Sequence, residues 1–163
     1  MFAIGDKIVY PMYGAGIIED LQEKIVDGKV QNYYVMSIPI GNLRIMVSAG
    51  KAEFLGLRQV YDKSEVLEII NSSTELRPIN VPENWNQRYK DNMTKIKSGK
   101  LNEVLDVYRN LTHREKERGL SSAEKKILTT VKQIIISEII LTQDVDKFKA
   151  EEMLAESFQN CYN

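Results

Sequence analysis

The sequence predicts an α+β protein in which a small β domain precedes an all-α domain. Residues 6–60 contain short runs rich in β-branched and aromatic residues, separated by turn-forming residues. After about residue 60, apolar residues recur instead at the spacing of helices. Two of these helical segments begin with a capping-box pattern, Asp62 with Glu65 and Ser121 with Glu124.

The β domain is expected to contain four or five short strands. The clearest ones lie at residues 7–10, 15–18, 33–38 and 43–47. Asp27-Gly28 and Gly41-Asn42 are strong signals for tight turns. Strands of this length and spacing favour a small barrel or a strongly bent sheet. Four residues around the first turn are interpreted as structural: Tyr10, Pro11, Gly14 and Gly16.

The second part of the chain is expected to form a short apolar helix and four longer ones. The short helix starts at Asp62, and residues 72–82 follow as a loop or linker containing Pro78 and Pro82. The longer helices are expected at residues 85–97, 101–118, 121–141 and 145–160. The predicted division is a β domain at 1–60, a helix and linker at 61–82, and a helical domain at 83–163.

Composition excludes several classes of protein. No run of 18 apolar residues is present, and the N-terminus lacks the pattern of a signal peptide, so we expect a cytoplasmic protein with no membrane contact. His113 and Cys161 are the single histidine and cysteine, which is too few for a His/Cys metal cluster or a nucleophile–histidine dyad. Phosphate-binding glycine motifs are also missing. We therefore expect a monomeric binding protein without cofactor, metal or enzymatic activity.

The net charge of −1 conceals a basic segment. Residues 83–133 carry 12 Lys or Arg and 7 Asp or Glu, a net charge of +5. Trp85, the only tryptophan, opens the first helix of this segment, with Asn84 as N-cap and Gln87 in the place of its capping partner. From the residues alone two interpretations stand. The ring is core beside a solvated basic surface, or it lies against a nucleic-acid base while lysines and arginines hold phosphates.

Three segments resemble one known family. Residues 4–16 read Ile-Gly-Asp-Lys-Ile-Val-Tyr-Pro-Met-Tyr-Gly-Ala-Gly, residues 84–90 read Asn-Trp-Asn-Gln-Arg-Tyr-Lys, and residues 117–125 read Glu-Arg-Gly-Leu-Ser-Ser-Ala-Glu-Lys. In this order and at this spacing they resemble the CarD/CdnL family of bacterial transcription regulators. The resemblance implies a Tudor-like, SH3-like β domain, similar to the RNA polymerase-interaction domain of transcription-repair coupling factors, followed by a compact helical DNA-binding domain.

The same resemblance implies a function and site residues. Members bind the RNA polymerase β subunit and the minor groove of promoter DNA at the upstream edge of the bubble, with little sequence specificity, and stabilise the open complex. The DNA-binding positions correspond to Trp85, Arg88, Lys90 and Lys125. The polymerase-binding positions correspond to Lys24 and Met46. Because Met46 stands where some members have arginine, Arg44 is a candidate replacement for that charge; solvated edge-strand charge is the alternative reading of Lys24 and Arg44.

Two other functions remain open at this point. A polymerase-docking module with no DNA role would explain residues 1–60 but leave Trp85 and the basic segment without a task. A nucleic-acid-binding protein independent of polymerase would bind DNA tightly by itself. One short basic patch on a net-acidic chain predicts weak DNA binding unless polymerase supplies a second attachment.

Overall fold

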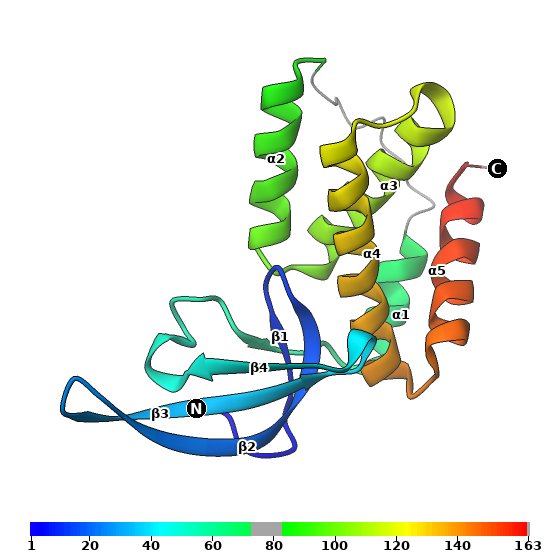
Figure 1. Cartoon of the computed structure of the whole chain (residues 1–163). Helices are drawn as coiled ribbons and strands as arrows, with labels where there is room; N and C mark the ends of the chain where they lie inside the picture. The colour runs from blue at the N-terminus through cyan, green and yellow to red at the C-terminus, as the bar shows by residue number, and fades with distance from the viewer. Residues whose placement is uncertain (73–82, 163) are drawn as a thin grey trace.

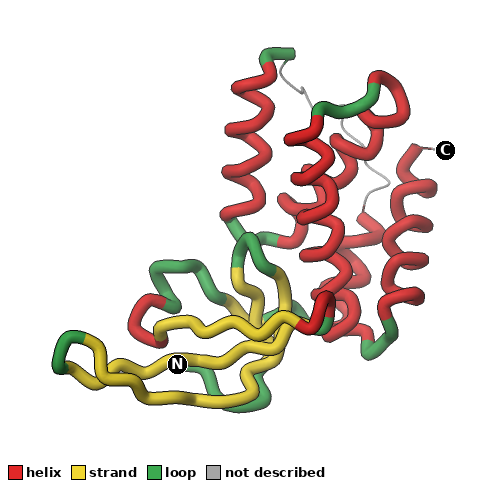
Figure 2. Tube along the Cα trace, in the orientation of Figure 1, coloured by secondary structure: helices red, strands yellow, loops and turns green. Residues whose placement is uncertain are grey.

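The N-terminal residues form a five-stranded antiparallel sheet, and the following residues form five α-helices that rise from one end of it (Figures 1 and 2). The computed structural model describes residues 1–72 and 83–162, with side chains of the last helix described through Phe158. The α+β prediction is confirmed. The strands are β1 (Lys7–Tyr10), β2 (Gly14–Val26), β3 (Lys29–Ile38), β4 (Leu43–Ser48) and β5 (Arg58–Gln59), in the order β4-β3-β2-β1-β5.

Strands β2 and β3 are longer than predicted and form a two-stranded ribbon beyond the rest of the sheet (Figure 1). β1 pairs with only Gly14–Ile17 of β2, whereas β3 pairs with β2 up to Val26. Asp27 and Gly28 close the ribbon with φ values of 52° and 76°, as the predicted tight turn requires. Residues 19–26 escape prediction because both faces of the ribbon are largely exposed, so the sequence shows no alternation of apolar and polar residues.

The sheet wraps around a small apolar core of its own. One face of β1, β2, β3 and β4 contributes to this core, which contains Ile8, Ile18, Tyr34, Met36 and Val47 together with Ala52 and Leu57 from the segment before β5. The β domain therefore has enough buried apolar surface to hold its curvature.

The helices are α1 (Lys63–Asn71), α2 (Trp85–Lys97), α3 (Leu101–Arg118), α4 (Ser122–Gln143) and α5 (Lys147–Tyr162). Three predicted N-caps are confirmed: the side chains of Asp62, Asn84 and Ser121 each accept a backbone hydrogen bond from the first turn. Glu124 completes the capping box with Ser121. No helix among the described residues is long and apolar enough to span a membrane.

Helix α1 packs with the helical domain. Val66 and Ile70 are fully or almost fully buried in the same core cluster as residues of α3, α4 and α5. Arg109 of α3 also donates a hydrogen bond to the Ile70 carbonyl, at 3.1 Å. The sequence groups α1 with the linker, whereas its packing puts the end of the β domain near Tyr61. The predicted linker at 72–82 lies almost wholly outside the described residues.

The turn between β1 and β2 docks directly onto the helices. Pro11 is buried against Gly99, the middle of the three residues between α2 and α3, and a Cβ on Gly99 would lie 2.8 Å from Pro11 Cγ. Gly14 meets α4 in the same way, since a Cβ there would lie 2.8 Å from Ser137 Oγ. Both glycines also have positive φ, which strains any other residue. The structural role predicted for Pro11 and Gly14 is thus to permit close contact between the two domains.

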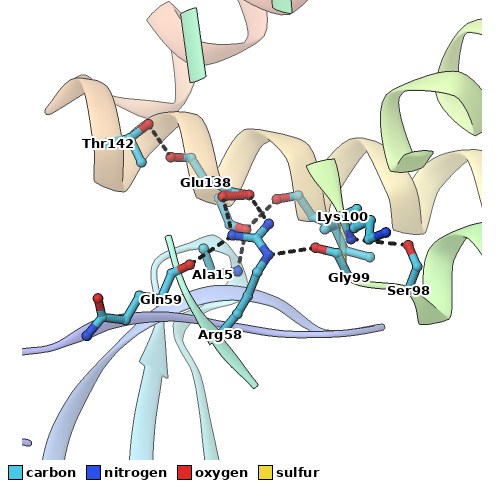
Figure 3. A network of polar contacts seen from close by, with 10 residues as sticks. Ala15, Arg58, Gln59, Ser98, Gly99, Lys100, Glu138 and Thr142 are labelled. Carbon is cyan, nitrogen blue, oxygen red and sulfur yellow. Dashed lines mark hydrogen bonds and ion pairs between the residues drawn. The ribbon is translucent and has the colours of Figure 1, made fainter. Parts of the chain in front are cut away.

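A buried ion pair joins the domains beside this contact (Figure 3). Arg58 of β5 donates two hydrogen bonds to the carboxylate of Glu138 in α4, at 2.8 and 3.1 Å, and a third to the carbonyl of Gly99 at 2.8 Å. Its guanidinium also lies 4.2 Å from the centre of the Tyr61 ring. Glu138 is only 2% exposed. Arg58 thereby connects the sheet, α4 and the α2–α3 junction.

We expect Glu138→Ala to lower the free energy of unfolding by about 2–4 kcal/mol, because it leaves the largely buried Arg58 guanidinium without its main partner. Glu152→Ala is the matched control, since it removes an exposed partner of Lys149 and should cost less than about 1 kcal/mol. Urea unfolding measures both. Equal losses would contradict a special role for the interdomain pair.

Candidate nucleic-acid and polymerase interfaces

Trp85 lies at the start of α2 with its ring exposed. The Asn84 side chain caps the helix by accepting hydrogen bonds from Asn86 N at 2.9 Å and Gln87 N at 3.3 Å. The Trp85 side chain is 43% exposed and stacks on Tyr89, one turn later, with 5.5 Å between ring centres and 18° between ring planes. Tyr89 is 39% exposed. The helix thus presents two nearly parallel aromatic rings to solvent.

Gln87 does not act as the predicted reciprocal capping partner. Its amide donates instead to Asp91 of the next turn, at 2.8 Å. A glutamine at this position can satisfy either partner, and here the carboxylate along the helix is the one it contacts. Among the described residues, Asn84 is therefore the one whose side chain caps α2.

Arg88 is in a different environment from the one that a phosphate contact needs. It is 6% exposed, and its Nε lies 3.5 Å from the carboxylate of Glu124 at the start of α4. Its Nη1 donates to the carbonyl of Glu83 at 2.6 Å. Arg114 of α3 approaches the same Glu124 carboxylate, at 3.8 Å. In this structure Arg88 helps to hold three helices together and is directed away from solvent, which corrects the expectation of an exposed guanidinium.

Lys90 and Lys125 are both exposed, Lys90 in the middle of α2 and Lys125 in the first turn of α4. The start of α2 lies at the end of the helical domain away from the sheet (Figure 1). α2 and α4 both start at that end (Figure 1), and Arg88–Glu124 joins their first turns. At about 100° per residue, Lys90 lies about 140° around α2 from Trp85. The predicted set is therefore divided. Trp85 and Lys125 are accessible in the first turns of α2 and α4, Lys90 is accessible farther along α2 and on another side from the ring, and Arg88 is internal.

The three predicted polymerase-binding residues lie on one face of the sheet. Strand register pairs Lys24 with Gln31, Met46 with Val35 and Arg44 with Ser37. These three partners are an even number of residues apart along β3 and alternate with its core residues Tyr34 and Met36, so they lie on the face opposite the β-domain core. All three side chains are exposed. Lys24 Nζ lies 5.9 Å from the Tyr33 ring, and Arg44 pairs with Glu19 at 3.2 Å.

Both strands that carry these residues have an open edge. β4 is the outermost strand of the sheet, and residues 20–26 of β2 pair with β3 alone. Unpaired backbone groups of such edges are where another strand can add. The ribbon also exposes Leu21, Ile25 and Val30, and Ile25 and Val30 are paired directly across it. Exposed apolar residues gathered in this way are typical of a contact surface.

Sequence reasoning misses the residues that hold these sites in place. Tyr89 stacks on Trp85, and the i, i+4 spacing of the two aromatic residues is the sequence signal for such a pair on one helix face. Sequence reasoning expects Glu124 only as a cap, and it finds no local signal for Arg58 and Glu138 because 80 residues separate them. Within residues 1–72 and 83–162, no cluster of His, Cys, Asp or Glu is arranged to hold a metal ion.

The fold and its exposed residues define a class of two-domain binding protein, with a β domain open at its edges and a helical domain that presents an aromatic pair. Residues 2–61 match the family model described as CarD-like/TRCF RID domain, and residues 65–155 match that described as CarD, C-terminal domain. The chain is also 40% identical over 144 residues to the "Putative transcription factor YdeB" of Bacillus subtilis (strain 168), covering 85% of this chain and 90% of that protein. The chain belongs to the CarD family of transcription factors, whose N-terminal domain is of the RNA polymerase-interaction type.

The buried pair of Arg88 and Glu124 can be tested by comparing a substitution of Arg88 with one of the exposed Lys90. We expect Arg88→Gln to cost about 2–4 kcal/mol of unfolding free energy and to change the emission of Trp85, because it leaves Glu124 with a weaker partner at the base of α2. Lys90→Gln, two residues away and exposed, should change stability by less than about 0.5 kcal/mol. Urea unfolding followed by tryptophan fluorescence, which reports Trp85 alone, measures both. A harmless Arg88→Gln would contradict the buried role.

Proposed function

We propose that this protein binds the β subunit of RNA polymerase through its β domain and promoter DNA through the start of α2, and that it stabilises the open complex at initiation. The observation that carries the proposal is the exposed stacked pair of Trp85 and Tyr89 at the end of the helical domain away from the sheet. Family membership supports the polymerase part, and the exposed rings with Lys90 and Lys125 support the DNA part.

An exposed aromatic pair is suited to contact bases that have lost their stacking partners. Inserting a ring between stacked bases of a duplex costs a few kcal/mol, but at the edge of a melted bubble that cost is already met. The ring therefore binds open DNA better than closed DNA, and only such a difference in affinity shifts an equilibrium. A difference of about 1.4 kcal/mol changes the ratio of open to closed complexes about tenfold.

Stacking on Tyr89 prepares Trp85 for this contact. A free indole at a helix terminus samples several rotamers, and fixing them on binding costs free energy. Contact with Tyr89 restricts the ring before DNA binds, and the buried Arg88–Glu124 pair fixes the first turn of the helix that carries it. Lys90 and Lys125 then supply charge for phosphates, which positions the protein without reading sequence.

Attachment to polymerase makes a weak DNA contact sufficient. Binding at the β domain turns the DNA contact into an intramolecular step with a high effective concentration. The interdomain contacts of Arg58, Pro11 and Gly14 keep the distance and orientation between the two surfaces fixed. On the polymerase side, the open edges of β2 and β4, with Lys24, Met46 and Arg44 on one sheet face, are the proposed contact.

The proposal describes a non-enzymatic regulator that acts as one copy on each polymerase, in the compartment where polymerase works. Both matched families are of the transcription-factor and polymerase-interaction type.

We expect Trp85→Ala to shorten the lifetime of the open complex about tenfold relative to the wild-type protein, since base–aromatic stacking contributes about 1–3 kcal/mol. Binding to polymerase should be unchanged. Lifetimes are measured by competitor challenge of preformed complexes, and polymerase binding by titration without DNA. Phe148→Ala is the matched control because Phe148 is a 76% exposed aromatic residue on α5. Identical lifetimes for both variants would contradict a role in DNA binding and would favour a polymerase-docking module without one.

The β-domain contact has its own test. We expect the double variant Lys24→Glu and Met46→Glu to weaken binding to polymerase at least about tenfold, because it places two carboxylates on the proposed contact face. Lys149→Glu on α5 is the control and should bind normally. Titration of the full-length proteins against polymerase measures the affinities. Normal binding of the double variant would move the interface to another surface.

A further inference from the structure

The first half of α4 carries a polar, cationic face. Lys125, Lys126 and Lys132 are exposed there, together with Thr129 and Gln133. At about 100° per residue these five side chains fall within an arc of about 120°. We call these five residues the α4 face. A groove of about 500 Å³ runs beside it, and Lys125, Thr129, Lys132 and Gln133 line that groove.

No carboxylate of α4 lies among the lysines of the α4 face, whereas Glu115 of α3 and Glu151 of α5 line the groove beside it. The segment from Lys125 to Ser137 contains three lysines and no Asp or Glu. Among the ion pairs of the described residues, none involves Lys125, Lys126 or Lys132.

Three other lysines of the helical domain, Lys95, Lys147 and Lys149, each lie 3.2–3.9 Å from a carboxylate. Lys95 lies 3.9 Å from Asp106, and Lys149 lies 3.2 Å from Glu152. Glu151, which also lines the groove, lies 3.9 Å from Lys147. The lysine ammonium groups of the α4 face are thus available to pair with an anion from another molecule.

The α4 face starts at the Trp85 end of the domain and runs toward the sheet. Lys125 follows Glu124, which contacts Arg88 one turn after Trp85. Lys132 lies seven residues further along, about 10 Å down the helix axis. The face ends at Ile136, which is buried and shares the groove with Ile40 of the β domain. A length of about 10 Å corresponds to about three phosphates on each strand of duplex DNA.

The side chains on this face suit a phosphate backbone better than a protein partner. Lysine ammonium, threonine hydroxyl and glutamine amide groups all donate hydrogen bonds to phosphate oxygens. Protein interfaces depend on aromatic or arginine anchors seated in pockets, and the five residues of the α4 face include none.

We propose that the α4 face binds the phosphate backbone of the duplex that continues upstream from the fork, with Lys132 and Lys126 as contacts additional to Lys125. This inference rests on the proposed function, since it assumes that Trp85 marks the fork. It gives the protein a second, sequence-independent hold on DNA, and the direction of the α4 face sets the path of the duplex from the Trp85 end toward the β domain.

The test uses full-length Lys126→Gln/Lys132→Gln, with Lys149→Gln as the matched control on α5. Open complexes are formed on two templates, one with long upstream duplex and one ending just upstream of the fork, and their lifetimes are measured over a range of salt concentrations. We expect the double variant to shorten the lifetime several-fold on the long template only. The slope of the logarithm of the lifetime against log salt should fall by about 0.9 for each phosphate that is no longer neutralised. The control should match the wild type on both templates.

Two results would overturn the inference. An unchanged lifetime and salt slope on the long template would show that the α4 face does not contact DNA. An equal loss on both templates would assign the α4 face to an acidic surface of polymerase. In either case a shortened lifetime for Trp85→Ala in the same assay would leave the proposed function standing, whereas an inert Trp85→Ala would remove that function itself. An unchanged melting midpoint of the double variant confirms that folding is intact.

Discussion

The buried ion pair of Glu138 with Arg58 is the interaction on which the rest of the arrangement depends. A carboxylate that is 2% exposed costs several kcal/mol unless it is paired and hydrogen-bonded, so the helical domain requires a cation at this point. The β domain supplies it, and the same guanidinium reaches the Gly99 carbonyl at the end of α2. Directional bonds of this kind select one orientation between the domains, whereas apolar contacts alone allow several.

Helix α4 has a second buried carboxylate near its other end, and the two carboxylates position different neighbouring elements. Glu138 fixes α4 to the sheet, and Glu124, 14 residues earlier and thus about 21 Å away along the helix axis, fixes the start of α2 through Arg88. Both acidic groups are occupied internally. The exposed surface between them therefore retains only lysines and neutral polar residues, which is why an almost neutral chain contains a locally cationic face.

These features are consistent with a regulator that binds DNA weakly and acts through attachment to polymerase. A net charge of −1 limits attraction to DNA in general, and one short basic surface becomes effective only when another contact holds it in place. In the proposed function, the stacked rings of Trp85 and Tyr89 contribute a contact whose strength depends on whether the DNA is open. Rigid attachment between the two surfaces matters because a flexible linkage would lower the effective concentration of the rings at the DNA.

Local sequence by itself determined the division into a β and a helical part, the helix boundaries and three N-caps, because periodicity and capping act over a few residues. Trp85 stood out for the same reason. The family resemblance also came from short segments, and the matching models confirm it. Only the tertiary structure decided that Arg88 is internal, that α1 belongs to the helical core and that Arg58 meets Glu138. Burial and ion pairing between residues far apart in the chain depend on how the elements pack, and no local pattern encodes that.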